Sequence, residues 1–496
     1  MGVIRFIVHP PEMLSRWTEL HRAYMSGIDG RVFPTRIEVD ASAMTVRRPT
    51  SESGKLHVAW PVPGFGHPMV STSSLRERDE PYFLPVELAR GKIGQLNDQI
   101  STWELAGMQM PTAVKSTARR ALQSFAKAAA SQEQQAESNQ MATDALVLAF
   151  QAADQVAREY ARQRLAVRQK RTRQLPASLG CNLGQSIPDG TLSDAYQRAF
   201  STATVPMDWK CIEANEGEYN WDLADAQVRW AESSKLHVRG GPILDLSLHG
   251  LPSWLSKWKS DFMNLQSFVC DYVETAMSRY VGRIRVWEIS GRGNTGGALG
   301  LNEEQMLTLV ARTIEVAHRT EPEGEFLPSV EQTWAEYQAR GAHRLSPLQF
   351  VDALLRAGVG LGGVSLEISI GYKPRGSQSR DLLDVSRLID QWSTLGIPVH
   401  ATLAFPSSSG TDSLACSENC LRDPSFHDAW SPETQAEWVD SYLPLLLSKP
   451  AVVGIDWAHL SDAVAHELPH AGLVDAQGQP KPALERMTRH LQTNLD

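Results

Sequence analysis

The sequence predicts an α/β fold, in which a (β/α)8 TIM barrel follows a small all-β sandwich and a helical segment. Three regions of different character lead to this prediction. Residues 1–85 alternate apolar and polar positions, residues 86–175 have helical periodicity, and residues 176–496 alternate short apolar segments with amphipathic stretches. With 496 residues, the chain is also longer than a single hydrophobic core usually supports, so we expect more than one structural unit.

The first region contains short β-branched segments such as GVIRFIVH and GKLHVAWPVP. Turn-forming stretches such as PTSESG separate them. Alternation of this kind is typical of strands with one buried face. We therefore predict a small antiparallel β-sandwich over residues 1–85.

The second region, residues 86–175, is rich in Ala, Gln, Glu and Arg, as in ALQSFAKAAASQEQQAES. Its periodicity predicts at least two long helices, which we interpret as a spacer that packs its apolar faces on its neighbours. An oligomerisation coiled coil is the alternative, although heptads are not sustained. The oligomeric state is left open by the sequence.

The third region contains eight strand candidates that alternate with helical stretches, which is the pattern of a (β/α)8 barrel. The strand candidates are residues 177–184, 202–209, 237–246, 284–291, 325–332, 363–371, 398–405 and 452–462. Functional residues of such barrels lie at the carboxyl ends of the strands. We therefore searched these ends for side chains that carry chemistry.

The composition excludes several classes of protein. Apolar residues make up 42% and charged residues 21% of the chain, which excludes disorder throughout. The net charge of -9 argues against nucleic acid as a partner. No apolar run is long enough to span a membrane and no secretory signal is evident, so we expect no membrane partner. A cytoplasmic location is expected unless the chain has been trimmed.

The five cysteines form no pattern of paired metal ligands. We expect reduced thiols, and a disulfide between Cys416 and Cys420 is the alternative. Neither a metal nor a cofactor is predicted, because the glycine-rich SGRGNTGGALG matches neither a phosphate-binding loop nor a dinucleotide fingerprint.

Three stretches carry a resemblance to a known family. They are VPMDWKCIEANEGEYNWDLADAQVRWAESSKLHVRGG, LGIPVHATLAF and VVGIDWAHLSDAVAHELPHAGLVDAQGQPKPALERM. These stretches resemble the endo-xylanases of glycoside hydrolase family 10, over residues 177–492. The resemblance implies a TIM barrel with O-glycosyl hydrolase activity and a carbohydrate partner. One interpretation of the N-terminal sandwich is then an accessory carbohydrate-binding module.

The two catalytic positions implied by the resemblance hold other residues. In RVWEISGRGN, the position of the family's acid/base glutamate is Arg292, and in HATL the position of its nucleophile is Leu403. Arginine stays protonated at neutral pH and leucine has no nucleophilic atom. We therefore expect a divergent glycoside hydrolase with relocated carboxylates. The alternatives are an inactive carbohydrate-binding pseudoenzyme and a structural scaffold.

A glycosidase needs two carboxyl groups, about 5–5.5 Å apart for retention or about 6.5–9.5 Å for inversion of configuration. Glu331 and Glu367 follow neighbouring predicted strands, which lie about 4.8 Å apart in a sheet, so we predict this pair as catalytic. Glu288 and Asp245 are the next candidates for the catalytic carboxyl groups. The alternative is that these carboxylates are ion-pair partners of basic residues such as Arg292.

A set of aromatic and polar residues near the strand ends is predicted to bind the sugar. Aromatic faces and a few polar groups are typical of such ligand sites, although about half of the aromatics could simply belong to the core. The order of charges around Trp209 is reversed relative to the family, so we expect a substrate other than plain xylan. The predicted binding residues are Asp208, Trp209, Lys210, Arg292, Trp334, Tyr337, Tyr372, His400 and Trp457.

Overall fold

The computed structural model describes residues 2–172, 175–341, 343–427 and 429–494. Its N-terminal part contains two small sheets of four strands each within the described residues. One has the order β4 (Arg36–Val39), β5 (Met44–Arg48), β1 (Gly2–Ile7) and β8 (Tyr82–Phe83). The other has the order β3 (Val32–Phe33), β2 (Tyr24–Ser26), β6 (Lys55–Ala59) and β7 (Met69–Ser71). The pairing is antiparallel except between β1 and β8.

Alternation along these strands builds a common core. Ile4 and Phe6 of β1 point inward, whereas Arg5 between them is exposed. They share a hydrophobic cluster with Leu56 and Val58 of the other sheet. The predicted all-β part is therefore present as two small sheets on one core.

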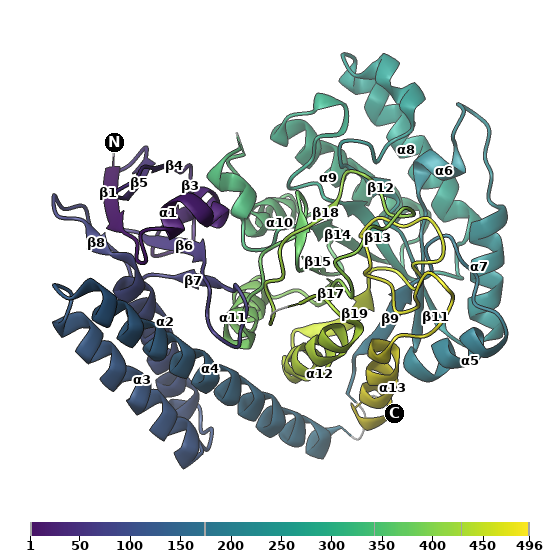
Figure 1. Cartoon of the computed structure of the whole chain (residues 1–496). Helices are drawn as coiled ribbons and strands as arrows, with labels where there is room; N and C mark the ends of the chain where they lie inside the picture. Colours follow the sequence, from purple (N-terminus) through teal and green to yellow (C-terminus); the bar gives the residue numbers. More distant parts are fainter. Residues whose placement is uncertain (1, 173–174, 342, 428, 495–496) are drawn as a thin grey trace.

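Three long helices follow in the described chain: α2 (Leu84–Leu105), α3 (Thr112–Ala130) and α4 (Gln135–Arg171). Their buried residues include many alanines, and small side chains let helix axes approach closely. Helix α4 packs against α2 and α3 and also contacts α11 and α12 of the barrel, so that it runs from the small sheets to the barrel (Figure 1). The helical segment is thus packed on both neighbours.

The remaining chain forms a closed parallel barrel. Its eight strands are β9 (Ser178–Asn182), β10 (Thr202–Val205), β11 (His237–Gly240), β13 (Val286–Gly291), β14 (Glu325–Val330), β15 (Val364–Ser369), β17 (Val399–Ala404) and β19 (Val452–Trp457). The pairing of β19 with β9 and of β11 with β13 closes the ring within the described residues. A short strand, β12 (Leu244–Asp245), continues the third strand along β13. The predicted fold class is confirmed.

Helices cover the outside of the barrel. They are α5 (Gly190–Ala199), α7 (Asp222–Ser233), α8 (Phe262–Arg279), α9 (Glu303–Thr320), α10 (Pro347–Arg356), α11 (Leu382–Ser393), α12 (Pro432–Ser448) and α13 (Pro482–Asn494). Capping boxes at Asn302 and Ser346 fix the starts of α9 and α10, because each cap side chain and the third helical residue satisfy one another's backbone donors.

Shorter elements lie in the connections. They are α1 (Met13–Arg16), α6 (Trp209–Ile212), the antiparallel pair β16 (Tyr372–Lys373) and β18 (Cys420–Leu421), and the 3-10 turns at Thr18–Arg22, Ser253–Trp258, Ala298–Gly300 and Glu336–Ala339. Among the described residues, no helix is both long and apolar enough to cross a membrane. All five cysteines are described, and each is a free thiol.

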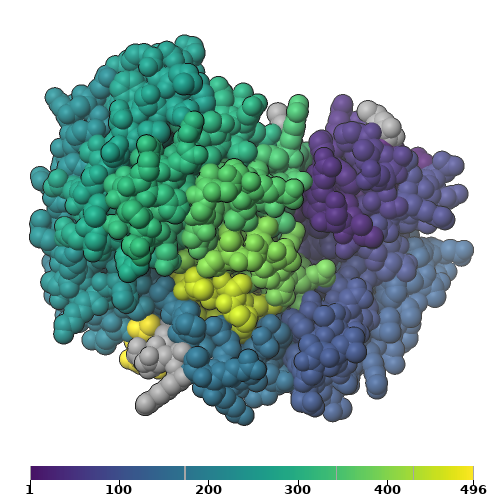
Figure 2. Space-filling view, turned by 180° about the vertical axis from the view of Figure 1, so that it is seen from behind, coloured from purple at the N-terminus to yellow at the C-terminus, as the bar shows by residue number. Residues whose placement is uncertain are grey.

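The N-terminal sheets dock directly on the barrel loops. The backbone N–H of Met69 donates to the carbonyl of Ser379 at 2.8 Å, and that of Thr35 donates to the carbonyl of Ala339 at 2.9 Å. Buried Arg380 donates to the hydroxyl of Tyr24 at 2.9 Å. Figure 2 shows the purple N-terminal part lying against the green part of the barrel.

Candidate active site

Arg292 stands at the centre of the carboxyl end of the barrel, directly after β13. Of the described acidic side chains, four contact its guanidinium. Nη1 lies 3.0 Å from Oδ2 of Asp245, and Nη2 lies 2.7 Å from Oε2 of Glu467. Nε lies 3.3 Å from Oε2 of Glu367 and 3.6 Å from Oε2 of Glu331. One arginine therefore joins carboxylates from four different segments.

The four carboxylates reach this point because parallel strands present their carboxyl ends at the same face. Asp245 ends β12, Glu331 follows β14 and Glu367 lies in β15. Glu467 belongs to the loop after β19 and also contacts Arg375.

The backbone of Arg292 is itself unusual, with a φ of 61°. Left-handed backbone is costly for a residue with a side chain, and it persists only where surrounding contacts enforce it. Here the N–H of Arg292 donates to the carbonyl of Ser329 at 3.1 Å. The turn directs the guanidinium at the carboxylates.

Burial and neighbouring charges shift the pKa values of these carboxyl groups in different directions. Burial raises the pKa of Glu367 to about 7, although Arg292 opposes the shift. Burial also raises the pKa of Glu331. Asp245 is buried as well, but Arg292 and Arg375 outweigh the desolvation and hold its pKa below the usual value. The site thus combines a carboxyl group whose pKa is raised with one whose pKa is lowered.

Hydroxyl groups fix two of these acids in place. Ser329 donates to Oε1 of Glu367 at 3.0 Å, and Thr295 donates to Oε1 of Glu331 at 2.5 Å. Because both glutamates approach the same Nε of Arg292, their Oε2 atoms lie no farther apart than about 7 Å, the sum of 3.6 and 3.3 Å. This bound includes the separation of about 5–5.5 Å that retaining glycosidases use, but only the lower end of the range of about 6.5–9.5 Å for inverting ones.

Comparison with known proteins identifies the family of the barrel. The sequence model of glycosyl hydrolase family 10 matches residues 180–489, which are more than half of the chain. The chain belongs to glycosyl hydrolase family 10. Members of this family are glycosyl hydrolases, enzymes that act on carbohydrates.

Curated relatives of this family 10 chain are endo-1,4-beta-xylanases at low identity. Endo-1,4-beta-xylanase B of Neocallimastix patriciarum is 23% identical over 213 residues, 41% of this chain and 24% of the relative. Endo-1,4-beta-xylanase 3 of Hypocrea jecorina is 31% identical over 83 residues, 17% and 23% of the two chains. The chain therefore matches about a quarter of the length of these relatives.

Two solved xylanases align with about two thirds of this chain. Native xylanase 10B from Thermotoga maritima aligns with 66% of this chain and 98% of its own, at 17% identity and a TM-score of 0.48. The GH10 xylanase of Thermobacillus composti aligns with 63% and 96%, at 17% identity and a TM-score of 0.49.

The remaining predicted carboxylate, Glu288, lies deeper in the family 10 barrel. Arg239 forms ion pairs with both Glu288 and Asp456, and its Nη1 lies 2.6 Å from Oδ2 of Asp456. Nη2 of Arg239 also donates to the hydroxyl of Ser365 at 3.0 Å. All of these groups are buried. Glu288 is thus occupied by a structural ion pair below the Arg292 centre.

His400 is also buried in the barrel wall, in β17. Within the described residues neither of its ring nitrogens has a hydrogen-bond partner, and burial lowers its pKa to about 3. The imidazole of His400 packs against Gly454. A larger residue would not fit at position 454, because its Cβ would lie 2.3 Å from Nδ1 of His400.

Three of the predicted aromatic contacts lie in the core. Trp209 stacks on Tyr272 with ring centroids 4.5 Å apart, and Trp457 donates through Nε1 to the carbonyl of Ala471 at 2.7 Å. Tyr372 is fully buried too. Rings enclosed by protein have no face free for a sugar, which is the alternative that the sequence left open for about half of the aromatics.

The other predicted binding residues are less enclosed. Trp334 is half-buried beneath the guanidinium of Arg380, 5.0 Å from the ring centroid. Tyr337 lines a cleft of about 540 Å³ between the barrel loops and the N-terminal sheets, together with Tyr24 and Lys373.

Asp208 and Lys210 lie together at the start of α6. Lys210 is exposed, and its Nζ lies 3.9 Å from Oδ2 of Asp208. Burial raises the pKa of Asp208. This pair lies after β10, at the same face of the barrel as Arg292.

Sequence reasoning missed two features of the site. Glu467 was not considered, although an acid in the loop after the last strand, as in AHELPH, was an available signal. The group of His459, Asp462 and His466, which could hold a metal ion, was not predicted either, because its residues follow none of the cysteine-based metal patterns. Its signal was HLSDAVAH, with two histidines and an aspartate in one loop.

Proposed function

We propose that this family 10 barrel hydrolyses glycosidic bonds of a poly- or oligosaccharide other than plain xylan, with carboxyl groups gathered around Arg292. The observation that carries the proposal is that Arg292 contacts both Glu367, at 3.3 Å, whose pKa is raised to about 7, and Asp245, at 3.0 Å, whose pKa is lowered. Titratable groups whose environments push their pKa values apart are typical of acid/base pairs.

The family's usual catalytic positions do not supply these groups. Leu403 is buried in β17, where it pairs with Ile368 and Trp457 of the neighbouring strands. Its side chain has no nucleophilic atom. The burial and four contacts of Arg292 favour a fixed cation at the acid/base position. In this proposal, catalysis therefore falls to relocated carboxyl groups.

Glu367 acts as the general acid in this proposal. A carboxyl that keeps its proton near neutral pH donates it to the leaving oxygen as the glycosidic bond breaks. Asp245 is the partner that the electrostatics favour, because an ionised carboxylate is needed to activate water or to attack the anomeric carbon. Glu331, the partner expected from the sequence, has a raised pKa and is the second choice.

A second candidate function is carbohydrate binding without hydrolysis. Arg292 and Arg375 together engage all four carboxylates of the centre. If substrate does not loosen these ion pairs, no carboxylate is left to act as base or nucleophile. The proposal and this alternative predict equal binding and opposite outcomes for hydrolysis.

The test is a screen of neutral and uronic-acid oligosaccharides on wild type and on Glu367→Gln, Asp245→Asn and Glu331→Gln, with binding and product release measured in the same samples. We expect hydrolysis by wild type and its loss in Glu367→Gln and Asp245→Asn, with binding retained. Glu325→Gln is the matched control, because Glu325 is exposed at the opposite end of β14. Binding without product in every variant would favour the second candidate.

A further inference from the structure

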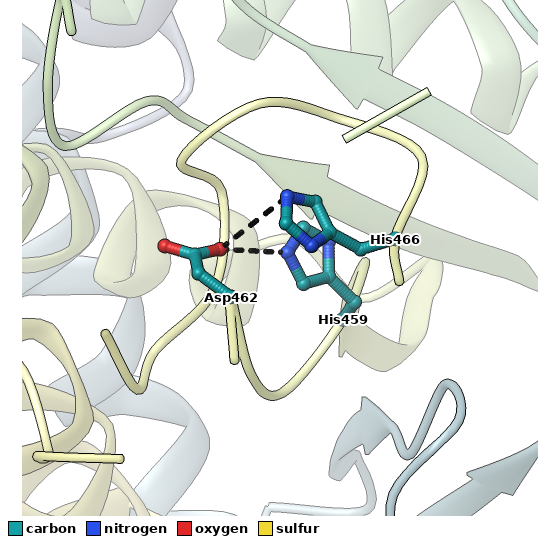
Figure 3. A group of neighbouring side chains, drawn as sticks. All are labelled: His459, Asp462 and His466. Atoms are coloured by element: carbon teal, nitrogen blue, oxygen red, sulfur yellow. Dashed lines mark hydrogen bonds and ion pairs between the residues drawn. The ribbon is translucent and has the colours of Figure 1, made fainter. Parts of the chain in front are cut away.

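A second group of ionisable side chains lies beside the candidate active site. His459, Asp462 and His466 come from the loop after β19, and their ligand atoms all lie within 4.8 Å of one another (Figure 3). Nε2 of His459 lies 3.0 Å and Nε2 of His466 lies 4.0 Å from the same Oδ1 of Asp462. Asp412, from the loop after β17, adds an Oδ2 that lies 3.0 Å from Nε2 of His466. The side chains of all four are buried.

The hydrogen bonds of His466 indicate a cation at this point. Its Nδ1 lies 2.7 Å from the carbonyl oxygen of Val464, which can only accept, so Nδ1 carries a proton. In neutral imidazole the lone pair is then on Nε2, and it faces carboxylate oxygens of Asp412 and Asp462. A lone pair that faces carboxylate oxygens is a donor arrangement that a bound metal ion would stabilise.

The charge balance leads to the same conclusion. Asp412 and Asp462 bring two negative charges, and Lys481, which pairs with Oδ2 of Asp462, brings one positive charge. With both imidazoles neutral, the group retains a net negative charge in a buried place. Uncompensated buried charge is costly. A metal ion at this point would compensate it, and Nδ1 of His470, 3.5 Å from Oδ2 of Asp412, is a further nitrogen that faces these carboxylates.

We propose that His459, His466 and Asp462 bind a divalent transition-metal ion, with zinc as the best fit. Two imidazoles and one carboxylate are a ligand set that zinc accepts in tetrahedral geometry. Ligand atoms around such a zinc ion lie about 3.3 Å apart, and the distances of 3.0 and 4.0 Å from Oδ1 of Asp462 to the two imidazoles bracket this value. His459 binds with its remaining proton on Nδ1.

The carboxylates are already oriented by the surrounding chain. Oδ1 of Asp462 accepts from the N–H of Gly472 at 2.7 Å, and Oδ2 of Asp412 accepts from the N–H of His470 at 2.9 Å. Partners of this kind hold ligands in place and tune metal affinity. The three protein ligands would leave the fourth tetrahedral position to a water molecule or to the nearby Asp412.

The ion would join two long loops at the barrel mouth. The N–H of His466 donates to the carbonyl of Leu414 at 3.1 Å, so the loops after β17 and β19 already touch here. Glu467, the next residue, binds Arg292 and Arg375. The proposed metal therefore positions Glu467 over the active-site centre. This inference is independent of whether the barrel is catalytic.

The test uses the full chain, stripped of metal by chelation and dialysed against buffered zinc, with bound zinc measured by mass spectrometry. We expect about one zinc ion per wild-type chain. Affinity in His459→Gln and His466→Gln should fall by more than about 100-fold, since even residues behind the ligands change affinity 10- to 100-fold. His490→Gln is the matched control, because His490 forms a single pair with Asp440 at 3.1 Å and should leave zinc binding unchanged.

A second measurement keeps the proposal testable if a glutamine variant does not fold. Cobalt(II) is added to the stripped wild-type protein, and its visible absorption is recorded before and after excess zinc. Intense tetrahedral bands that zinc removes are the expected result. Wild type that binds no zinc above the level of His459→Gln, or that gives no tetrahedral cobalt bands, would overturn the proposal in favour of a protonated His466.

Discussion

Two arginines in the same barrel bridge carboxylates in very different settings. Arg239 is enclosed, with 3% of its side chain exposed, and it joins Glu288 and Asp456. Arg292 lies closer to the mouth, and among its partners Glu467 keeps 37% of its side chain exposed. The pKa of Glu367 is raised to about 7 in the outer group. The two groups therefore differ in access: the ion pairs of Arg239 are sealed from solvent, whereas those of Arg292 reach it at Glu467.

We expect the largest loss of stability when the buried ion pairs of Arg239 are broken. Arg239→Met leaves Glu288 and Asp456 buried without their cation, so the free energy of unfolding should fall by about 3–5 kcal/mol. Urea denaturation followed by tryptophan fluorescence measures this loss. A loss below that of the corresponding Arg292 variant would break the distinction between the two groups.

Arg292→Met should have the next largest effect on stability, about 1–3 kcal/mol, because two of its hydrogen bonds to charged groups are short but water can reach their partners. The same change removes the cation that lowers the pKa values of Asp245 and Glu367, so both should rise. Carboxyl titration by NMR measures these shifts. Unchanged pKa values in Arg292→Met would contradict the assigned contacts.

A third effect is confined to one pH range. The folded pKa of Glu367, about 7, lies above the ordinary value of 4.5, so the folded protein keeps a proton that the unfolded chain has lost. Its contribution to stability is therefore fully present below pH 4.5 and is lost as the pH rises to about 7. Denaturation curves across this range should decline less for Glu367→Gln than for wild type. Parallel curves would count against the raised pKa.

The smallest effect concerns a single hydroxyl. Thr295→Val removes the hydrogen bond to Oε1 of Glu331, which should cost about 1 kcal/mol and raise the pKa of Glu331 further. Denaturation and carboxyl titration check both changes. A stability loss as large as that of Arg239→Met would show that the outer group is as tightly sealed as the inner one.

The sequence predicted the barrel strands that carry the site better than the contacts between the side chains of the site. All eight barrel strands fall within the predicted segments, because alternating apolar strands and amphipathic helices are local signals. The proximity of Glu331 and Glu367 followed from their place on neighbouring strands, and Arg292 was considered as an ion-pair partner for them.

The loops were harder to predict, because their conformation depends on tertiary contacts. Glu467 reaches Arg292 only through the folded loop after β19, and Asp412 meets His466 from another loop. The burial of Trp209 and Trp457 likewise depends on packing that the sequence pattern does not record.

The most direct test of the central claim is the titration of the Glu367 carboxyl in wild-type protein, assigned in carbon-detected NMR by its absence from Glu367→Gln. It needs no knowledge of the substrate. We predict that the Glu367 carboxyl ionises near pH 7 in the wild-type protein. Ionisation near the ordinary value of 4.5 would contradict it, because Glu367 could then not hold the proton that the proposed acid must donate.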